Sequence, residues 1–367
     1  MNDFLQLKDA CFKAGSSIAQ KDIVNVDGEF PIYGASGFIK NVNFYKQEKT
    51  YIGVVKDGAG VGRTMLLPPK SSVIGTIQYI LPKENVLAEY LYYVLTSMDL
   101  AKFATGATIP HIYFKDYSKE KICIPSLYIQ RQIAATLDKA SELIALRKKQ
   151  LNELDALAES VFYEIFGDPV KNEKGWKKGV IGDTIDTINY GTSLPATEGG
   201  KYKYLRMNNI TYSGYMDLCD LKYIDIDEKN KEKYIARKND LLFNRTNSKE
   251  LVGKSAIFTE DEEMILAGYI IRVRCNNEFH SRYIWGYLNC PHGKSYLRNL
   301  CKNIVGMANI NAKELQSIPL LLPPLPLQNH FATIIEKIEQ QKAQVKKALQ
   351  ESEDLFQRLM QDLFNPN

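Results

Sequence analysis

Two glycine-rich segments carry residue types that could hold a phosphate, but neither has the spacing that this chemistry needs. Val252-Gly253-Lys254-Ser255 ends like a phosphate-binding loop, yet the upstream glycine of such a loop would fall at Ser248. Asp57-Gly58-Ala59-Gly60-Val61-Gly62 is followed by Met65-Leu66-Leu67-Pro68-Pro69 rather than by a helix-forming run. Both segments are therefore predicted to be turns.

Other reactive residues form no catalytic or metal-binding pattern. The histidines stand apart, without acidic or cysteine neighbours at ligand spacing; they are His111, His280, His292 and His330. The six cysteines contain no Cys-x-x-Cys pair and are interpreted as reduced thiols of a cytoplasmic protein. Signatures of amino-group methylation, helicases and nucleases are missing as well. We expect a chain that recognises a partner without transforming it, with no metal site and no cofactor of its own.

Polar loops do carry the groups that read nucleic acid. Asn and Gln pair with adenine, Arg and Lys pair with guanine, and hydroxyls hold phosphates. The candidate DNA-binding residues of the first half are Lys40, Asn41, Lys56, Arg63, Thr108, His111 and Tyr113. Those of the second half are Arg206, Asn208, Asn209, Asn244, Arg245, Thr246, Asn247, Ser248, Lys254, Asn309 and Asn311. Any one of them also fits a solvated loop, so the prediction rests on their grouping.

The composition indicates a folded protein. Its charge is compatible with a nucleic-acid partner but does not require such a partner. The 367 residues suit two or three domains, with 45% hydrophobic residues and a net charge of +4. No apolar run approaches the roughly 18 residues of a membrane span, and the N-terminus does not resemble a signal peptide. We therefore expect no membrane association.

A long internal repeat indicates which elements position these loops. The segments that begin at Pro125 and Pro323 align without a gap, so that Gln130 falls on Gln328 and Phe166 on Phe364. Apolar residues step by three and four in both copies, the spacing of a coiled-coil seam. The first stripe is Ile133, Leu137, Ala140, Ile144, Leu151, Leu154, Ala158, Val161 and Ile165. The second is Phe331, Ile335, Ile338, Val345, Leu349, Phe356, Leu359 and Leu363, with Lys342 and Ser352 as polar breaks.

The globular segments before these helices also share landmarks in the same order. An apolar run (51–55; 241–243) leads through a polar loop to a Gly-basic-hydroxyl triplet (62–64; 253–255). An expected strand (73–81; 264–273), a short aromatic helix (89–97; 282–289) and a glycine loop (106–108; 306–308) follow. The predicted fold is α+β: two strand-rich globules and two long helices of about 60 Å. We expect the helices to pack antiparallel as a coiled coil, with a globule at each end and a pseudo-twofold relation.

These features resemble the specificity subunit of type I restriction–modification systems over essentially the whole chain. The marks are the alternating order of globule and helix, the helix starts at 124–130 and 322–328, the loop at 240–255 and the first-strand pattern at 31–37. The resemblance implies target-recognition domains at 1–124 and 169–322 and spacer helices at 125–168 and 323–367. Each domain would read one half of a bipartite asymmetric DNA site, and the helices would set the spacer and dock modification subunits.

The resemblance also implies the partners of the chain. They are double-stranded DNA, two modification (methyltransferase) subunits and restriction subunits. S-adenosylmethionine, ATP and Mg²⁺ are expected on those subunits and not on this non-catalytic chain.

Two alternatives stay open at this point. One is a two-headed coiled-coil scaffold that holds protein partners apart without base-specific DNA binding. The other is the recognition part of a single-chain restriction enzyme. The chain begins at a methionine and ends just beyond its second helix, which favours a complete protein. A steep fall of affinity with salt would distinguish DNA binding from the scaffold.

Overall fold

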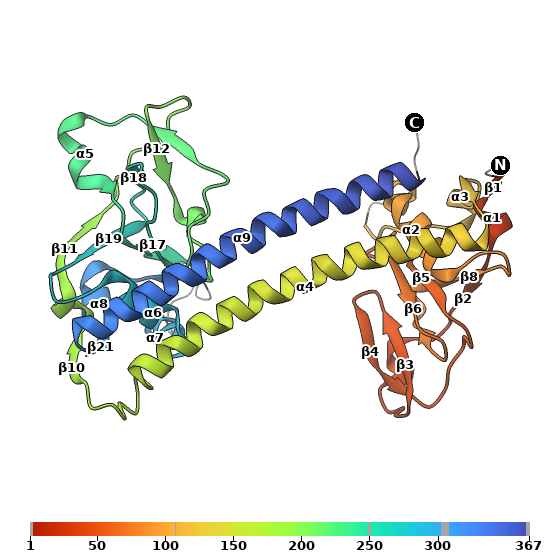
Figure 1. The fold of residues 1–367 in the computed structure, drawn as a ribbon, viewed down its shortest axis with the longest axis horizontal. Helices are drawn as coiled ribbons and strands as arrows, with labels where there is room; N and C mark the ends of the chain where they lie inside the picture. The colour runs from red at the N-terminus through yellow and green to blue at the C-terminus, as the bar shows by residue number, and fades with distance from the viewer. Residues whose placement is uncertain (1–2, 107, 249–250, 302–307, 365–367) are drawn as a thin grey trace. The chain divides into compact units, whose positions relative to one another are not determined.

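The computed structural model describes residues 3–106, 108–248, 251–301 and 308–364, and the chain divides into two compact units. Unit 1 comprises Met1–Lys148 and Lys347–Asn367, and unit 2 comprises Lys149–Lys346. Each long helix therefore contributes one segment to each unit (Figure 1). Ala107, Gly306 and Met307 of the predicted glycine loops lie outside the described residues.

Both units contain a four-stranded antiparallel sheet with the same strand order. In unit 1 the order is β2 (Cys11–Gly15), β8 (Ile77–Pro82), β5 (Tyr51–Val55) and β6 (Thr64–Leu67). In unit 2 it is β11 (Ile185–Tyr190), β19 (Ile270–Cys275), β15 (Leu241–Asn244) and β17 (Ser255–Ile257). Every residue of β5 and of β15 is buried. The predicted duplication of the globular segments is confirmed at the level of topology.

A second sheet differs in size between the units. It contains β4 (Gly37–Val42), β3 (Phe30–Gly34) and β7 (Ser72–Val73) in unit 1. In unit 2 it contains β13 (Lys222–Ile224), β12 (Tyr202–Leu205), β18 (Met264–Leu266) and β14 (Ile235–Ala236).

The prediction of one strand at 73–81 and one at 264–273 was wrong. Each range contains two strands that belong to different sheets. A turn carries the chain across, with the Ile77 amide donating to the Ile74 carbonyl (3.0 Å) and the Ile270 amide to the Ala267 carbonyl (2.8 Å).

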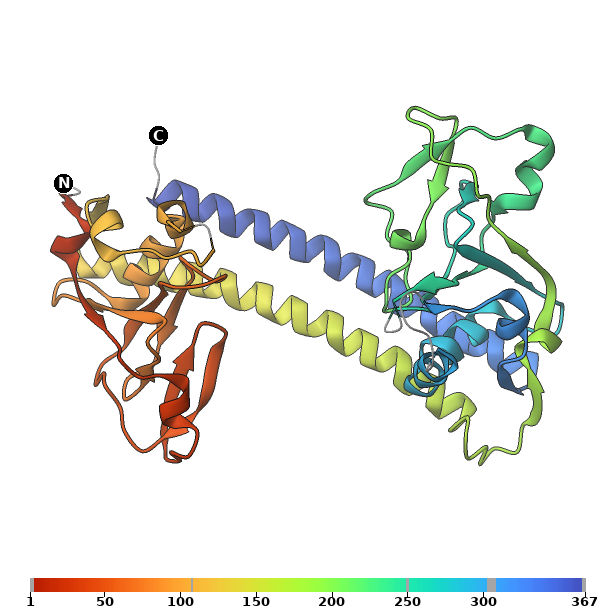
Figure 2. The ribbon, with the colours of Figure 1, turned by 180° about the vertical axis from the view of Figure 1, so that it is seen from behind.

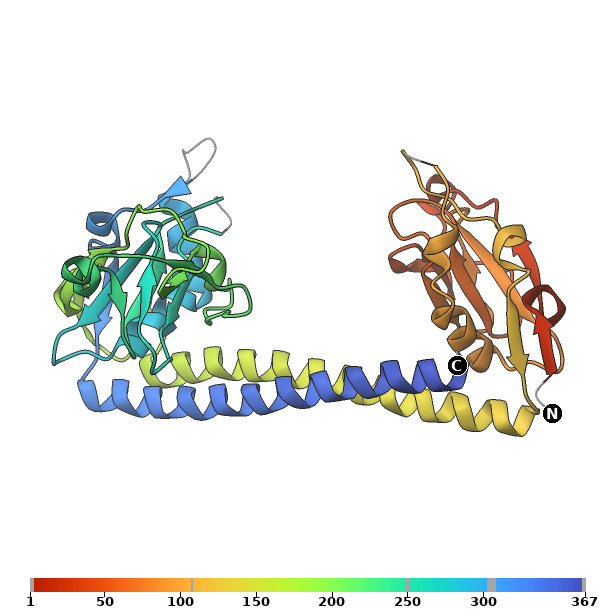
Figure 3. The ribbon, with the colours of Figure 1, turned by 90° about the horizontal axis from the view of Figure 1, so that it is seen from above.

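Short strand pairs connect each globular part with its long helix. β1 (Asp3–Gln6) pairs with β9 (Lys121–Ile124), which leads into α4 (Figure 3). β10 (Lys177–Val180) pairs with β21 (Pro319–Leu322), which leads into α9. β16 (Thr246–Asn247) pairs with β20 (Ala308–Asn309). The shorter helices are α1 (Leu7–Ala10), α2 (Ala88–Ser97), α3 (Phe114–Tyr117), α5 (Glu228–Tyr234), α6 (Ser281–Asn289), α7 (Pro291–Leu300) and α8 (Ala312–Gln316).

Helices α4 (Leu127–Phe166) and α9 (Leu325–Phe364) begin two residues after the predicted starts and end at the aligned phenylalanines of the repeat, inside the predicted spacer segments 125–168 and 323–367. Within each unit their segments pack antiparallel, as predicted (Figures 1 and 2). In unit 1, Lys148 lies 2.8 Å from Glu353. In unit 2, the rings of Phe166 and Phe331 lie 5.3 Å apart. Across the described residues, no helix combines the length and the apolarity needed to cross a membrane.

A buried glutamine fastens the start of each long helix to the globular part. Gln130 accepts a hydrogen bond from the Leu87 amide (2.8 Å) and donates to the Asn85 (2.9 Å) and Pro125 (2.8 Å) carbonyls. Both its side chain and that of Gln328 are fully buried. Because these bonds satisfy main-chain groups at the starts of α2 and α4 together, they fix the angle between the two helices.

Gln328 repeats the arrangement in unit 2. It accepts from the His280 amide (2.8 Å) and donates to the Pro323 (2.8 Å) and Glu278 (3.4 Å) carbonyls, at the starts of α9 and α6. This shared bonding pattern explains why the repeated helix start carries proline and glutamine at fixed spacing.

Helices α2 and α6 contact the long helices through side chains of different size. Unit 1 has Tyr93, whose hydroxyl donates to Asp138 (2.7 Å) and whose ring packs in a cluster with Leu137. Unit 2 has Gly286, where an added Cβ would lie 2.8 Å from Phe162 and 2.9 Å from Phe331. The glycine therefore leaves room for two phenylalanine rings supplied by α4 and α9.

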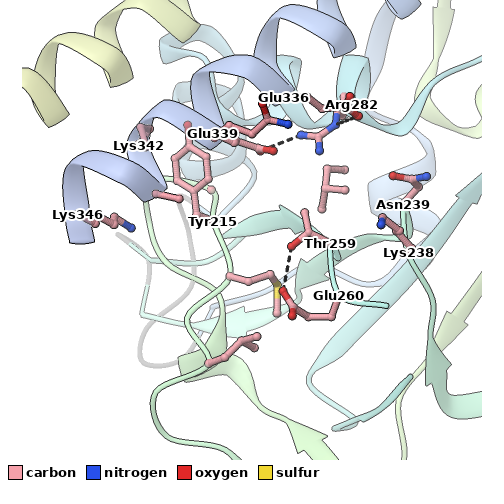
Figure 4. A pocket seen from close by; sticks show the side chains of 16 residues that line it. Tyr215, Lys238, Asn239, Thr259, Glu260, Arg282, Glu336, Glu339, Lys342 and Lys346 are labelled. Atoms are coloured by element: carbon pink, nitrogen blue, oxygen red, sulfur yellow. Dashed lines mark hydrogen bonds and ion pairs between the residues drawn. The ribbon is translucent and has the colours of Figure 1, made fainter. Parts of the chain in front are cut away.

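Lys342, predicted as a break in the stripe, is buried in the helix pair and makes an ion pair with Asp155 of α4. Its ammonium also lies 3.5 Å from the centroid of the Tyr215 ring, and burial lowers its pKa. One turn earlier, Glu339 accepts a hydrogen bond from Arg282 (2.8 Å). Of these residues, Tyr215, Arg282, Glu339 and Lys342 border a cavity of about 570 Å³ between α9 and the globular part of unit 2 (Figure 4).

Replacing Gln328 with leucine should destabilise the protein by about 2–4 kcal/mol, because buried main-chain groups that lose a partner cost about 1–3 kcal/mol each. Urea denaturation of the full chain measures the change. Gln350→Leu is the control, since Gln350 is exposed and bonds only Asp354 of the same helix, so its effect should stay within about 0.5 kcal/mol. Equal losses in the two variants would contradict the role assigned to Gln328.

Asp155→Ala should cost about 3–5 kcal/mol at neutral pH, because it leaves the buried ammonium of Lys342 without its carboxylate. Lys342→Met should cost less, since Asp155 is 44% exposed and water can solvate it. Raising the pH through the lowered pKa of Lys342 should restore stability to Asp155→Ala, because the neutral amine carries no desolvation penalty. Thermal unfolding across pH tests both statements, and a larger loss in Lys342→Met would refute them.

Candidate nucleic-acid interface

The loop that follows β5 in unit 1 and the loop that follows β15 in unit 2 are held by the same main-chain hydrogen bonds. In unit 2, the Gly253 amide donates to Asn244 (3.0 Å) and the Asn244 amide to Lys254 (2.8 Å). In unit 1, the corresponding bonds join Gly62 with Val55 (2.9 Å) and Val55 with Arg63 (2.9 Å). The two Gly-basic-hydroxyl triplets therefore occupy equivalent positions.

A second pair of main-chain contacts brings distant candidate residues together. The Ile112 amide donates to the Lys56 carbonyl, and the Ile310 amide donates to the Arg245 carbonyl, each at 2.9 Å. The residues beside them pair across the same junction: Asp57 with His111, and Thr246 with Asn309. Lys56 and His111 in unit 1 thus correspond to Arg245 and Asn309 in unit 2.

The Arg245 cluster of unit 2 consists of Tyr190, Arg245, Thr246 and Asn309. Arg245 Nε and Thr246 Oγ1 each donate to Asn309 Oδ1 at 3.0 Å. The Arg245 guanidinium lies 4.8 Å from the centroid of the Tyr190 ring, a cation–π distance. The Tyr190 hydroxyl in turn accepts from the Ala312 amide (2.8 Å). With only Nε engaged in these bonds, the two terminal nitrogens of Arg245 can donate to an acceptor in the plane of the guanidinium.

The Lys56 cluster of unit 1 consists of Lys56, Asp57, His111 and Tyr113. Asp57 lies between Lys56 and His111, with one carboxylate oxygen 3.4 Å from His111 Nδ1 and the other 3.7 Å from Lys56 Nζ. Tyr113 is 53% exposed, and Lys115 Nζ lies 5.3 Å from its ring centroid. The sequence offered no acidic neighbour for His111; the fold supplies Asp57.

Three candidate asparagines are occupied by their own loops. Asn209 is 2% exposed and donates to the Asp217 carbonyl (2.8 Å). Asn244 is fully buried, and with its amide oxygen and nitrogen assigned so that both find partners it donates to the Thr246 carbonyl (3.1 Å). Asn311 caps α8 by accepting from the Lys313 (2.9 Å) and Glu314 (3.0 Å) amides. In this structure these side chains shape the loops rather than face a ligand.

Several basic candidates are also held by the protein. Lys40 pairs with Asp27 (2.7 Å) and Arg206 with Asp220 (2.8 Å). Arg63 Nη1 donates to the Ala35 carbonyl (3.0 Å).

Lys254 Nζ donates to the Met207 carbonyl (2.9 Å), and burial lowers its pKa. Asn247 accepts from the Ser248 amide (2.8 Å). The exposed candidates are Asn41, Arg63, Thr108, Tyr113, Asn208, Ser248 and Asn309.

Tyr190 was not predicted from the sequence, although it lies directly under Arg245. It is the last residue of β11 and precedes Gly191, where an added Cβ would come within 2.2 Å of the Leu266 carbonyl oxygen. Within the described ranges, no group of three or more His, Cys, Asp or Glu residues lies together as a metal site.

Comparison with known families finds one match over most of the chain. The model of the family described as type I restriction modification DNA specificity domain matches residues 2–156 and 173–352.

Two curated relatives are distant in sequence. The EcoKI specificity subunit of Escherichia coli strain K12 is 24% identical over 257 residues, which cover 66% of this chain and 54% of that subunit. The MjaIX specificity subunit of Methanocaldococcus jannaschii is 24% identical over 293 residues, which cover 71% and 64%. The chain therefore spans less than two thirds of the length of these relatives.

Two solved structures share the fold. The S subunit of a type I restriction–modification system from M. genitalium aligns with a TM-score of 0.65 and 15% identity, over 100% of this chain and 96% of that one. A chain from a structural study of complex assembly and conformational transition in the type I R-M system aligns with a TM-score of 0.55 and 17% identity, over 98% and 96%.

Proposed function

Since the chain belongs to the family of type I restriction–modification DNA specificity domains and carries that domain twice, we propose that it is the DNA sequence-recognition subunit of a type I restriction–modification complex. Each globular domain reads one half of a bipartite, asymmetric site in double-stranded DNA. The helices α4 and α9 set the length of the unread spacer and dock the modification subunits.

The observation that carries this proposal is the paired placement of the Lys56 and Arg245 clusters. The same main-chain bonds hold both clusters at the end of the central strand, yet the side chains differ. Arg245 and Asn309 offer the donor and acceptor groups that pair with guanine and adenine, whereas the first domain offers Lys56 and His111. The two loops have equivalent main-chain conformations but carry different hydrogen-bonding side chains, as expected if the two domains read different half-sites.

In this proposal the chain is non-catalytic and acts in the cytoplasm. Its partners are two modification subunits, which hold S-adenosylmethionine, and restriction subunits, which use ATP and Mg²⁺. The purified chain alone should transfer no methyl group from S-adenosylmethionine to DNA, and adding the modification subunits should restore transfer to adenine. Radiolabelled methyl transfer checks this, and activity of the chain free of other subunits would contradict it.

Arg245→Ala should relax the half-site read by the second domain and cost about 1–3 kcal/mol of binding to the cognate site. Lys56→Ala is the matched variant, since it stands at the equivalent position of the first domain and should relax only the other half. Sequencing of methylated sites, in cells that carry the modification subunits, reads both effects. An even loss of affinity over all sequences would make Arg245 a phosphate contact instead.

Salt titration separates this function from the protein scaffold. Binding to random duplexes through phosphates weakens steeply as salt concentration rises. A chain that binds no duplex at any salt concentration, alone or with modification subunits, would favour the scaffold.

A further inference from the structure

Helix α7 places two cations beside the loop that carries the Arg245 cluster. Lys294 and Arg298 are four residues apart and therefore lie on one face of the helix. Together with Tyr212 and Lys254 they line a single hollow. Lys254 is directly across the main-chain pairing from Asn244, the residue before Arg245.

The contacts around this hollow hold its cations in place. Lys294 Nζ lies 4.4 Å from the centroid of the Tyr212 ring, and Arg298 Nε donates to the Lys294 carbonyl (3.3 Å). An added Cβ at Gly253, whose φ is +78°, would come within 2.7 Å of Leu297, so α7 packs directly on the loop. The basic groups are thus part of the loop's own framework rather than of a remote surface.

The charge of the hollow is not balanced by its own lining, although Lys294 also borders a second cavity that Asp155 and Glu159 line. No carboxylate belongs to the described residues that line it. By contrast, other lysines of the same unit have close acidic partners, as Lys203 has in Glu262 (2.6 Å). Asp155 and Glu159 raise the pKa of Lys294, but the opposing effect of burial is larger and lowers it. The hollow has a volume of only about 10 Å³, room for no more than a water molecule, so an anion is held at its rim, where it offsets the positive charge.

We propose that Lys254, Lys294, Arg298 and Tyr212 form a binding site for a backbone phosphate of double-stranded DNA, next to the half-site read by the second domain. The proposal rests on the proposed function and adds to it an anchor that positions the DNA without reading bases. Lys and Arg supply charge-assisted hydrogen bonds to phosphate oxygens.

The site is a property of the second domain. In unit 1, the glycine equivalent to Gly253 is Gly62, and an added Cβ there would meet the Ala101 amide at 2.6 Å. Ala101 belongs to a single 3-10 turn, Leu100–Phe103, which stands where unit 2 has the ten-residue helix α7. The two domains should therefore contribute unequally to the electrostatic part of DNA affinity.

The test is the salt dependence of DNA binding by the chain in complex with its modification subunits. Arg298→Gln and Lys294→Gln should each reduce the slope of log K against log salt by about 0.9, the value for one phosphate contact on B-DNA. Each should weaken binding to cognate and scrambled duplexes by the same factor. Arg298→Lys keeps the charge and should keep the slope, and Lys203→Gln should leave it unchanged because that cation is already paired.

An unchanged slope in both glutamine variants would overturn the anchor, and so would a change in which half-site sequences are methylated, since that would mark a base contact. Arg298 is exposed, so its variant tests the site without disturbing the core. Failure of the proposed function looks different: the wild-type complex would show neither salt-dependent binding nor sequence preference.

Discussion

Each globular domain is held on its long helix by one buried glutamine whose hydrogen bonds all go to main-chain groups. Gln130 and Gln328 contact amides and carbonyls, and none of these contacts depends on a neighbouring side chain. The sequence of a domain can therefore diverge while its attachment stays the same. This explains how two domains with the same strand order and different loops occur on helix starts that share proline, leucine and glutamine at the same spacing.

The loops of the candidate interface follow the same rule at a smaller scale. Main-chain bonds hold them at both ends, so the residues between can change without loss of the frame. Lys56 beside Asp57 and His111 makes a surface of mixed charge, while Arg245 beside Asn309 and Thr246 makes a basic and amide surface. Under the proposed function, one scaffold used twice yields an asymmetric recognition site.

The sequence predicts the repeated elements well because periodicity and repetition are properties of the chain itself. The long helices α4 and α9, the short helices α2 and α6 and the paired triplets follow from that pattern. The sequence pattern does not distinguish Asn208, which is exposed, from Asn209, which is buried and donates to the Asp217 carbonyl. An asparagine in a polar loop can bind a ligand or the backbone of its own loop equally well. Which of the two it does depends on the backbone groups that the folded loop brings next to its side chain. Tyr190 was missed for a similar reason, since its partner Arg245 comes from a different strand.

The ring beneath Arg245 has an entropic consequence for binding. Tyr190 and Asn309 restrict the rotamers of the guanidinium before any ligand arrives, so folding has already removed part of its freedom. In the first domain the position equivalent to Tyr190 is Gly15, the last residue of β2, and Lys56 has no ring beneath it there. Ordering a free side chain costs about 0.5–1.5 kcal/mol on association. The Arg245 side chain of the second domain is therefore more preorganised for binding than Lys56 of the first domain. Lys56 loses more conformational freedom when a ligand binds.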